Sequence, residues 1–546
     1  HVYGRFKEIT ENDKSKLDDP NWLKENAPFS GELFLGHLRY GTYGSNSIEA
    51  CHPFLRQNNW MTRNLVLAGN FNMTNVDEQF NLLIDLGQHP KKKADTVTVL
   101  EKIGHFLDEE NEVLFQKYKR LGYGNREITA MISKNLDIRS ILTRSAEDFD
   151  GGYAMSGLVG NGDAFVLRDP NGIRPAFYYQ DDEVVVVASE RPVIQTAFNL
   201  KVEDVKEITP GHALIVKKDG KISMDLIRQP GKKLSCSFER IYFSRGSDKD
   251  IYLERQALGR LVVPRIIQSI TGDLENTVFS FIPNTAEVSF YGMIKGLEEF
   301  HNERKIVEIA SLDKSDQDGF RKLLNERVRI EKVAIKDAKL RTFITQDSER
   351  NELVAHVYDI TYGTIRPGVD NLVVIDDSIV RGTTLKKSIL RILDRLEPKK
   401  IVVVSSAPQI RYPDCYGIDM SLLQDFIAFQ AALALIKESG KDKLLRDVYD
   451  LCASDVNNIN QVNHVQKIYA PFTEDQISNK VSELLRPQDI HAEVEIIFQS
   501  LDALAEACPD HRGDWYFSGN YPTHGGNRVV NRAYMNFFEG KRERAY

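Results

Sequence analysis

A short apolar run that ends in two acidic residues constrains the fold of this chain more than any other feature. Asn371–Ile375 is rich in Val and Ile, as a strand buried on both faces of a parallel sheet should be. Asp376 and Asp377 follow directly, and the apolar residues of 385–396 then recur at helical spacing. The pattern predicts a strand, a turn and a helix, with both carboxylates where the strand ends.

The turn between this strand and helix is suited to a sugar phosphate. The N–H groups of a Gly/Thr turn and of a helix N-terminus favour a phosphate group, while carboxylates accept hydrogen bonds from ribose hydroxyls. The alternative is an ordinary strand–turn–helix in which a threonine caps the helix. Spacing alone leaves both interpretations open. The polar and glycine residues of the turn are Ser378, Arg381, Gly382, Thr383 and Thr384.

Length and composition predict a globular protein with at least two domains, because 546 residues exceed a single core. The net charge of −8 argues against a nucleic-acid partner. The most apolar long stretch, 426–436, is too short to span a bilayer, so no membrane partner is expected. The cysteines form no CxxC pair, which argues against a disulfide framework or a zinc site and favours a cytoplasmic location. They are Cys51, Cys236, Cys415, Cys452 and Cys508.

The letters of 371–384, NLVVIDDSIVRGTT, resemble the loop that binds 5-phosphoribosyl-1-pyrophosphate (PRPP) in the type I phosphoribosyltransferases, particularly in the amidophosphoribosyltransferase family. In that family the two acids hold the ribose 2- and 3-hydroxyls, and the following turn wraps the 5-phosphate. The resemblance implies that Asp376 and Asp377 also hold Mg²⁺, directly or through the ribose hydroxyls. It implies that Lys336, from a flexible loop, reaches the pyrophosphate. The implied PRPP-binding set is Asp376, Asp377, Ser378, Arg381, Gly382, Thr383, Thr384 and Lys336.

The amino-terminal half resembles the class II (N-terminal-nucleophile) glutamine amidotransferases. The matching segments are GHLRYGTYGSNSIEACHPF (36–54), NFNMTN (70–75) and RDPNGIRP (168–175). By position, Arg39 binds the α-carboxylate of glutamine, a task suited to guanidinium, and Asp95 holds its α-ammonium group. The side chain of Asn70 and the main-chain N–H of Phe71 stabilise the oxyanion.

The nucleophile of that family is an N-terminal cysteine activated by its own α-amino group. It normally precedes the Arg39 region by several tens of residues, and nothing here matches it. Because His1 is not a natural start, we expect the amino-terminal segment with this cysteine to be missing from the chain, rather than the glutaminase to be lost.

The segment YFSGNYPT (516–523) resembles the tail of relatives that carry a [4Fe–4S] cluster. Cys236 stands at one ligand position, but Cys415 is one residue out of register and the expected pair of cysteines before the tail is absent. Because four thiolates are normally required, we expect no cluster. Cys236 is predicted to be a buried, apolar residue.

Strand patterns predict a sheet-rich amino-terminal half, with Gly151–Leu158 and Asp163–Leu167 as paired strands and Val184–Ala188 as a further buried strand. The expected class is α/β and α+β: an N-terminal-nucleophile-type αββα sandwich followed by a type I phosphoribosyltransferase domain with a parallel sheet. The expected domains are 1–233, glutamine amidotransferase-like; 234–430, phosphoribosyltransferase; and 431–546, a helical extension that packs on the transferase domain.

The function implied by the resemblance is the glutamine-dependent conversion of PRPP to 5-phosphoribosylamine by a cytoplasmic homo-oligomer, with purine nucleotides as feedback ligands. One alternative is an ammonia-dependent transferase with a non-hydrolytic amino-terminal domain. Another is a PRPP-binding regulator without catalysis.

Overall fold

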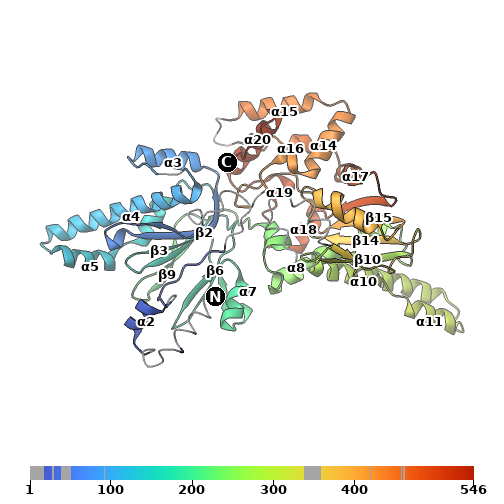
Figure 1. Ribbon diagram of the computed structural model, residues 1–546, viewed down its shortest axis with the longest axis horizontal. Coiled ribbons are helices and arrows are strands. Elements are labelled where there is room, and N and C mark those ends of the chain that lie inside the picture. Colours follow the sequence, from blue (N-terminus) through green and yellow to red (C-terminus); the bar gives the residue numbers. More distant parts are fainter. Residues whose placement is uncertain are drawn as a thin grey trace. The chain divides into compact units, whose positions relative to one another are not determined.

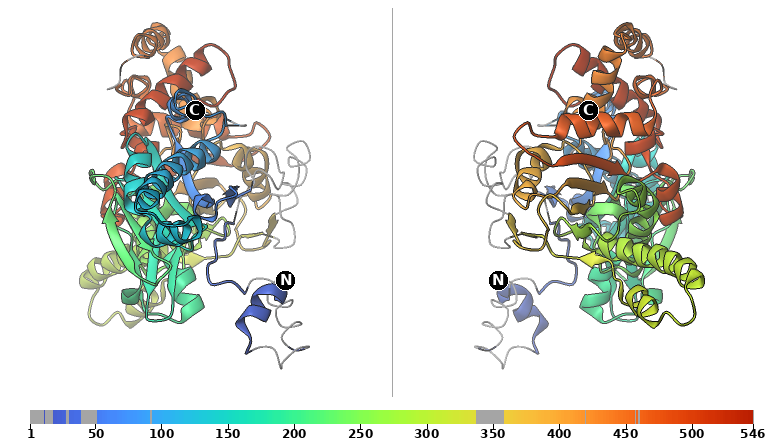
Figure 2. Two further views of the ribbon diagram at one scale, coloured as in Figure 1. Left: turned by 90° about the vertical axis from the view of Figure 1, so that its left-hand side faces the viewer. Right: turned by 90° about the vertical axis from the view of Figure 1, so that its right-hand side faces the viewer.

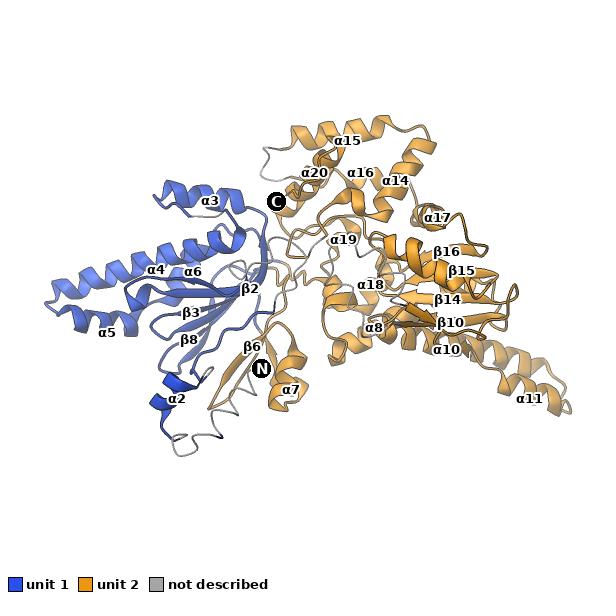
Figure 3. Ribbon diagram, in the orientation of Figure 1, with its two compact units in different colours: residues 1–170, 208–231 blue, residues 171–207, 232–546 orange. Residues whose placement is uncertain are grey.

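The chain divides into two compact units (Figure 3). Unit 1 comprises residues 1–170 and 208–231, and unit 2 comprises residues 171–207 and 232–546. The computed structural model describes residues 11, 18–27, 30–38, 51–90, 93–336, 358–418, 420–456, 458 and 461–545, with Lys336 described by its backbone alone.

Unit 1 is built on a six-stranded antiparallel sheet in the order β1-β2-β3-β4-β8-β9. The longest pairing joins β2 to β3, from Leu65 opposite Val159 to Met73 opposite Gly151. The predicted pairing of the strands near 151–158 and 163–167 is confirmed by β3 and β4. The strands are β1 (Phe54–Arg56), β2 (Leu65–Met73), β3 (Gly151–Val159), β4 (Ala164–Arg168), β8 (His212–Val216) and β9 (Ile222–Leu226).

One face of this sheet packs against the helix α4 (Asp95–Arg120), as Figure 1 shows. Alternate residues of β2 supply the sheet's side of the core, and Phe71 is among them. Residues of α4 at helical spacing, such as Val99, Ile103 and Leu107, supply the other side. The remaining helices of unit 1 are α2 (Pro20–Asn26), α3 (Val76–Asp85), α5 (Asn125–Asn135) and α6 (Ile138–Ala146).

Unit 2 contains a five-stranded parallel sheet in the order β11-β10-β14-β15-β16. In the central strand, Leu372 and Val374 belong to one hydrophobic core, whereas Val373 and Ile375 belong to a second core on the opposite face. Burial on both faces explains the uninterrupted apolar run, and the predicted buried strand is confirmed. The strands are β10 (Thr277–Phe281), β11 (Arg329–Ile330), β14 (Asn371–Asp376), β15 (Lys400–Ser405) and β16 (Glu493–Phe498).

Helices cover both faces of the parallel sheet. In Figures 1 and 2, the carboxy-terminal helices lie on one side of the strands and α10 lies on the other. The cores agree, because α9 and α10 contribute to one and α13 and α14 to the other. The helices are α8 (Lys249–Leu261), α9 (Val263–Ser269), α10 (Glu287–Ser311), α11 (Gln317–Asn325), α13 (Leu390–Asp394), α14 (Ile427–Glu438), α15 (Lys443–Ser454), α16 (Gln466–Tyr469), α17 (Glu474–Leu485), α18 (Leu501–Ala507), α19 (Trp515–Ser518) and α20 (His524–Phe538).

Two small sheets complete the strands described in unit 2. The first has the order β6-β5-β7, with β5 (Phe177–Gln180), β6 (Val185–Ala188) and β7 (Lys206–Glu207), and it is accompanied by α7 (Arg191–Phe198). The predicted strand at 184–188 is therefore present, but β6 is only half-buried because it is an edge strand. The second sheet pairs β12 (Ala334–Lys336) with β13 (Tyr358–Ile360).

The division into 1–233, 234–430 and 431–546 remains a prediction about function. Structurally, residues 171–207 belong to unit 2, and the segment after residue 430 contributes β16 to the parallel sheet as well as helices. Among the described residues, no helix has the length and apolar composition needed to cross a membrane.

Candidate functional site

The acid pair lies at the carboxyl edge of the parallel sheet of unit 2. Asp376 is the last residue of β14 and is paired with Ser405, the last residue of β15. The N–H of Ser406 donates to the main-chain carbonyl of Asp376 at 2.9 Å. The N–H of Ile282 donates to the main-chain carbonyl of Ile375, also at 2.9 Å. The ends of β10, β14 and β15 therefore meet at the edge where open α/β sheets bind ligands.

Local hydrogen bonds orient the two carboxylates. Oδ1 of Asp376 accepts from the N–H of Asp377 at 2.9 Å, and Oδ1 of Asp377 accepts from Oγ of Ser378 at 2.9 Å. The hydroxyl of Ser406 donates to the carbonyl of Asp377 at 3.1 Å. Both acidic residues are half-buried, so the pair is ordered by its neighbours and still reaches the surface.

The turn that follows the acids has a backbone that requires glycine. Gly382 has a φ of +67°, and a Cβ at this position would lie 2.6 Å from Cδ2 of Leu485. Thr383 and Thr384 are exposed, and Thr384, which precedes the π-helix Leu385–Ile389, makes no side-chain cap hydrogen bond. Thr384 therefore does not cap this helix with its side chain. Arg381 pairs with Asp425 at 3.5 Å and is more than half exposed.

Two residues that the sequence did not single out interact electrostatically with the acid pair. Burial raises the pKa of Tyr358 to about 12, and the carboxylates of Asp376 and Asp377 add to the rise. Burial lowers the pKa of Arg255, and the charge of Asp377 opposes that shift. Nε and Nη2 of Arg255 donate to main-chain carbonyls, including that of Ser244 at 2.7 Å. No local sequence pattern marks either residue, because both come from other segments of the chain.

Lys336 lies at the base of the segment that the sequence predicts as a flexible loop. Its backbone pairs with Tyr358 in the β12–β13 hairpin, and its side chain lies outside the described residues. The backbone of Lys336 therefore lies next to Tyr358, whose pKa the carboxylates of Asp376 and Asp377 help to raise.

In unit 1 the predicted oxyanion residues lie in the middle of β2. The ring of Phe71 belongs to the hydrophobic core, so the side chain of its neighbour Asn70 lies on the opposite face of the sheet. The N–H and C=O of Tyr153, the partner of Phe71, are both engaged with Asp169 on the β4 side. The amide of Phe71 therefore points away from β3.

Contacts through Thr96 and His52 connect Asp95 to β2. Asp95 is the first residue of α4, and its Oδ1 accepts from the N–H and the hydroxyl of Thr96 at 2.6 and 3.2 Å. Oγ1 of Thr96 lies 3.3 Å from Nε2 of His52, and Nδ1 of His52 lies 3.3 Å from the amide nitrogen of Gly69. No sequence motif assigned a role to His52 or Thr96, whose contacts arise only in the folded chain. Arg39 lies outside the described residues.

Comparison with known proteins agrees with this geometry. No family model matches the chain. Amidophosphoribosyltransferases of Pasteurella multocida, Escherichia coli and Saccharomyces cerevisiae are 25%, 28% and 25% identical over 449, 436 and 492 residues. The alignments cover 79%, 77% and 86% of this chain and 77%, 75% and 85% of the respective relatives. The resemblance to the amidophosphoribosyltransferases is confirmed.

A solved glutamine PRPP amidotransferase from B. subtilis, complexed with ADP and GMP, has the same fold. The TM-score is 0.57 at 22% identity, and the match covers 89% of this chain and 82% of that one. The predicted fold class, an N-terminal-nucleophile-type sandwich followed by a type I phosphoribosyltransferase domain, is confirmed.

The surroundings of the cysteines bear on the predicted absence of a [4Fe–4S] cluster. Sγ of Cys236 lies 3.5 Å from the hydroxyl of Tyr516, and burial raises the pKa of Cys236 to about 12. Cys452 contacts Asn531 instead, at 3.6 Å. In the part of the chain that the structure describes, no three His, Cys, Asp or Glu side chains are grouped to hold a metal ion. Cys236 is buried, as the sequence predicts, and the absence of a [4Fe–4S] cluster stays a prediction.

The position of Cys236 is surrounded by a buried ionic cluster of unit 2. The guanidinium of Arg174 donates to the carbonyl of Tyr416 and to Glu239, the latter at 2.9 Å. Asp414 lies 3.7 Å from it and accepts from the indole N–H of Trp515 at 3.1 Å. This network pairs the buried charges of Arg174, Glu239 and Asp414.

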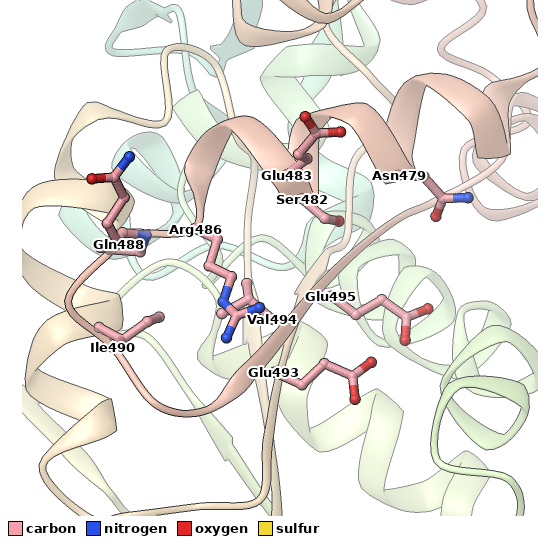
Figure 4. A pocket seen from close by; sticks show the side chains of 10 residues that line it. Asn479, Ser482, Glu483, Arg486, Gln488, Ile490, Glu493, Val494 and Glu495 are labelled. Carbon is pink, nitrogen blue, oxygen red and sulfur yellow. The ribbon is translucent and has the colours of Figure 1, made fainter.

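A pocket of about 760 Å³ lies elsewhere on unit 2, between α17 and β16 (Figure 4). Its lining includes Arg486, Glu493 and Glu495. Glu493 pairs with Lys400, the first residue of β15, so the pocket lies toward the amino ends of the parallel strands. It is therefore distinct from the acid pair, which lies at the carboxyl ends.

Proposed function

We propose that the chain converts PRPP and glutamine to 5-phosphoribosylamine, glutamate and pyrophosphate, the first step of de novo purine synthesis. One observation carries the proposal: two adjacent carboxylates and a glycine turn at the carboxyl edge of a parallel sheet. The amidophosphoribosyltransferase relatives support it over most of the chain.

In the transferase site, Asp376 and Asp377 accept hydrogen bonds from the ribose hydroxyls and stabilise the positive charge that develops on the ribose. The turn around Gly382 holds the 5-phosphate with its N–H groups and exposed hydroxyls. Lys336 neutralises the pyrophosphate. The PRPP-binding set is Asp376, Asp377, Ser378, Arg381, Gly382, Thr383, Thr384 and Lys336.

The donors of this site fit Mg²⁺. Asp376 and Asp377 are adjacent, half-buried carboxylates, and carboxylate oxygens are the ligands that a hard cation prefers. When bound, Mg²⁺ stabilises negative charge on the departing pyrophosphate. The protein's own contribution is to hold these two carboxylates at the edge of the sheet by the bonds from Ser378 and from the N–H of Asp377.

The glutamine site lies in unit 1. Arg39 binds the α-carboxylate of glutamine and Asp95 binds its α-ammonium group. The side chain of Asn70 and the N–H of Phe71 stabilise the oxyanion that forms when a nucleophilic thiolate adds to the amide carbonyl. The C–N bond then breaks, the nitrogen leaves as ammonia, and water hydrolyses the acyl intermediate to glutamate. The direction of the Phe71 amide, away from β3, supports the second donor.

At the transferase site the nitrogen of ammonia attacks C1 of the ribose as the bond from C1 to the pyrophosphate oxygen breaks. The nitrogen then loses a proton, which gives the neutral amine. The reacting ribose resembles an oxocarbenium ion, so water must be kept from it.

We further propose a cytoplasmic homo-oligomer with functional domains 1–233, 234–430 and 431–546. The ADP and GMP in the solved relative support purine nucleotides as feedback ligands.

The test measures pyrophosphate and glutamate release from PRPP with glutamine or with ammonium as the nitrogen source. We expect both sources to work, and we expect Arg39→Leu to abolish glutamine use and to spare ammonium use. Activity with ammonium alone, in a protein whose amino terminus has been determined, would favour the ammonia-dependent alternative. Absence of pyrophosphate release with either source would favour the regulator.

A further inference from the structure

Three segments of unit 1 meet beside the proposed glutamine site, and two of their residues have no role in the function proposed above. His52 precedes β1, Gly69 lies in β2 next to Asn70, and Thr96 is the second residue of α4, next to Asp95. The imidazole of His52 and the hydroxyl of Thr96 connect Asp95 to β2.

The hydrogen bonds between these residues have one consistent direction. The N–H of Gly69 can only donate, so Nδ1 of His52, at 3.3 Å, accepts. A neutral His52 then carries its proton on Nε2, which lies 3.3 Å from Oγ1 of Thr96 and donates to it. The hydroxyl of Thr96 in turn donates to Oδ1 of Asp95 at 3.2 Å.

The imidazole of His52 is also held by packing. The ring of His37 stacks on it with a centroid separation of 4.5 Å and an interplanar angle of 23°. Phe54 meets it edge-on at 5.1 Å. A Cβ at Gly69 would lie 2.6 Å from the carbonyl oxygen of Ala154, so β2 itself has no space for a side chain here.

We propose that His52 and Thr96 are positioning residues of the glutamine site. They tie the carboxylate of Asp95, which binds the α-ammonium group, to the strand that carries Asn70 and Phe71. The two ends of the glutamine molecule are then held at a fixed separation, which places the amide carbon at the oxyanion donors. The inference rests on the proposed function.

The first test is Thr96→Val, which keeps the shape of the side chain and removes the hydroxyl. The matched control is Thr98→Val, in the same helix and also buried, because Oγ1 of Thr98 has no hydrogen-bond partner among the described residues. We expect the KM for glutamine to rise about tenfold in Thr96→Val, the effect of losing a hydrogen bond to a charged group. The rate with ammonium should not change in either variant. Equal KM values for the two variants would overturn the proposal.

The second test compares His52→Gln with His52→Ala. A glutamine amide can accept from Gly69 and donate to Thr96, so His52→Gln should keep most of the glutamine affinity. His52→Ala can do neither and should resemble Thr96→Val. A similar KM in both His52 variants contradicts the proposed relay, since a role in packing alone does not depend on the amide.

The third test does not need activity. In the ¹⁵N NMR spectrum of the full chain with labelled histidine, His52 should be neutral, with its proton on Nε2. Its signals should shift in Thr96→Val and not in Thr98→Val. Retained glutamine binding with a proton on Nδ1 of His52 would overturn this assignment alone. A wild-type chain that binds no glutamine would overturn the proposed glutamine site, and this assignment with it.

Discussion

The two candidate sites differ in how the chain builds them. The acid pair and its turn are one continuous stretch at the end of β14, so a single strand–turn–helix supplies most of the proposed PRPP-binding residues. The glutamine site is assembled from residues before β1, within β2 and at the start of α4. A site formed by one continuous segment can be predicted from its amino-acid sequence. A site assembled from several segments shows its geometry only in the folded protein.

We expect the largest effect from a substitution in the continuous site of unit 2. Asp377→Asn removes a charge but keeps an oxygen that can accept from Ser378. We expect pyrophosphate release to fall about 1000-fold with either nitrogen source, because ribose positioning and charge stabilisation are both lost. The melting temperature should not change, since the residue is only half-buried. Asp502→Asn, at an exposed position of α18, is the control. Unchanged PRPP affinity would refute the assignment.

The second effect should be confined to the assembled site. Asn70→Ala removes one of the two proposed oxyanion donors, and glutamine-dependent product formation should fall about 100-fold. Residual activity should remain because the N–H of Phe71 is still present. The ammonium-dependent rate of the same variant is the internal control. A parallel loss of both activities would show that the two sites are not separate.

The contrast also explains how much the sequence predicted. The apolar run 371–375 predicted β14 because burial on both faces leaves no polar position between Leu372 and Ile375. The helix expected at 385–396 is present, but its first turn is a π-helix and α13 ends at Asp394. Apolar periodicity cannot distinguish the two hydrogen-bond patterns over so few residues.

The assembled site was predicted less completely for a physical reason. Asn70, Phe71 and Asp95 were predicted through resemblance to a family, whereas the roles proposed for His52 and Thr96 depend on contacts that link β2 to α4. Tyr358 is the same kind of residue in unit 2, because its relation to Asp376 arises from the β12–β13 hairpin and not from its neighbours in sequence.

A third prediction separates the stability of the parallel sheet from ligand binding. Asp370 is buried just before β14, and burial alone raises its pKa. Hydrogen bonds from Arg329 and Arg366 outweigh burial and lower the pKa to about 2. Since the folded-state pKa lies below the ordinary value, this stabilisation is present above about pH 4 and is lost as the pH falls toward 2.

Asp370→Asn should therefore reduce the free energy of unfolding by about 2–3 kcal/mol at pH 7, and by less as the pH approaches 2. Denaturant unfolding at several pH values measures the difference, with Asp318→Asn, at an exposed position of α11, as the control. The PRPP affinity of the folded protein should not change, because Asp370 lies at the amino end of the strand. A pH-independent difference would contradict the pKa assignment.

We expect the smallest effect from a glycine substitution, which tests whether the continuous site depends on its backbone as well as on its side chains. Gly382 and Gly440 have nearly equal φ angles, +67° and +65°, so an alanine at either position costs about 1 kcal/mol of backbone strain. Only at Gly382 does the added Cβ also meet Leu485, at 2.6 Å, whereas nothing lies within 4 Å at Gly440.

Gly382→Ala must therefore displace the turn, and we expect PRPP affinity to fall about tenfold while Gly440→Ala leaves it unchanged. Titration of both variants with PRPP measures this. Equal affinities would mean that the acids alone bind PRPP, and the continuous site would then reduce to two residues.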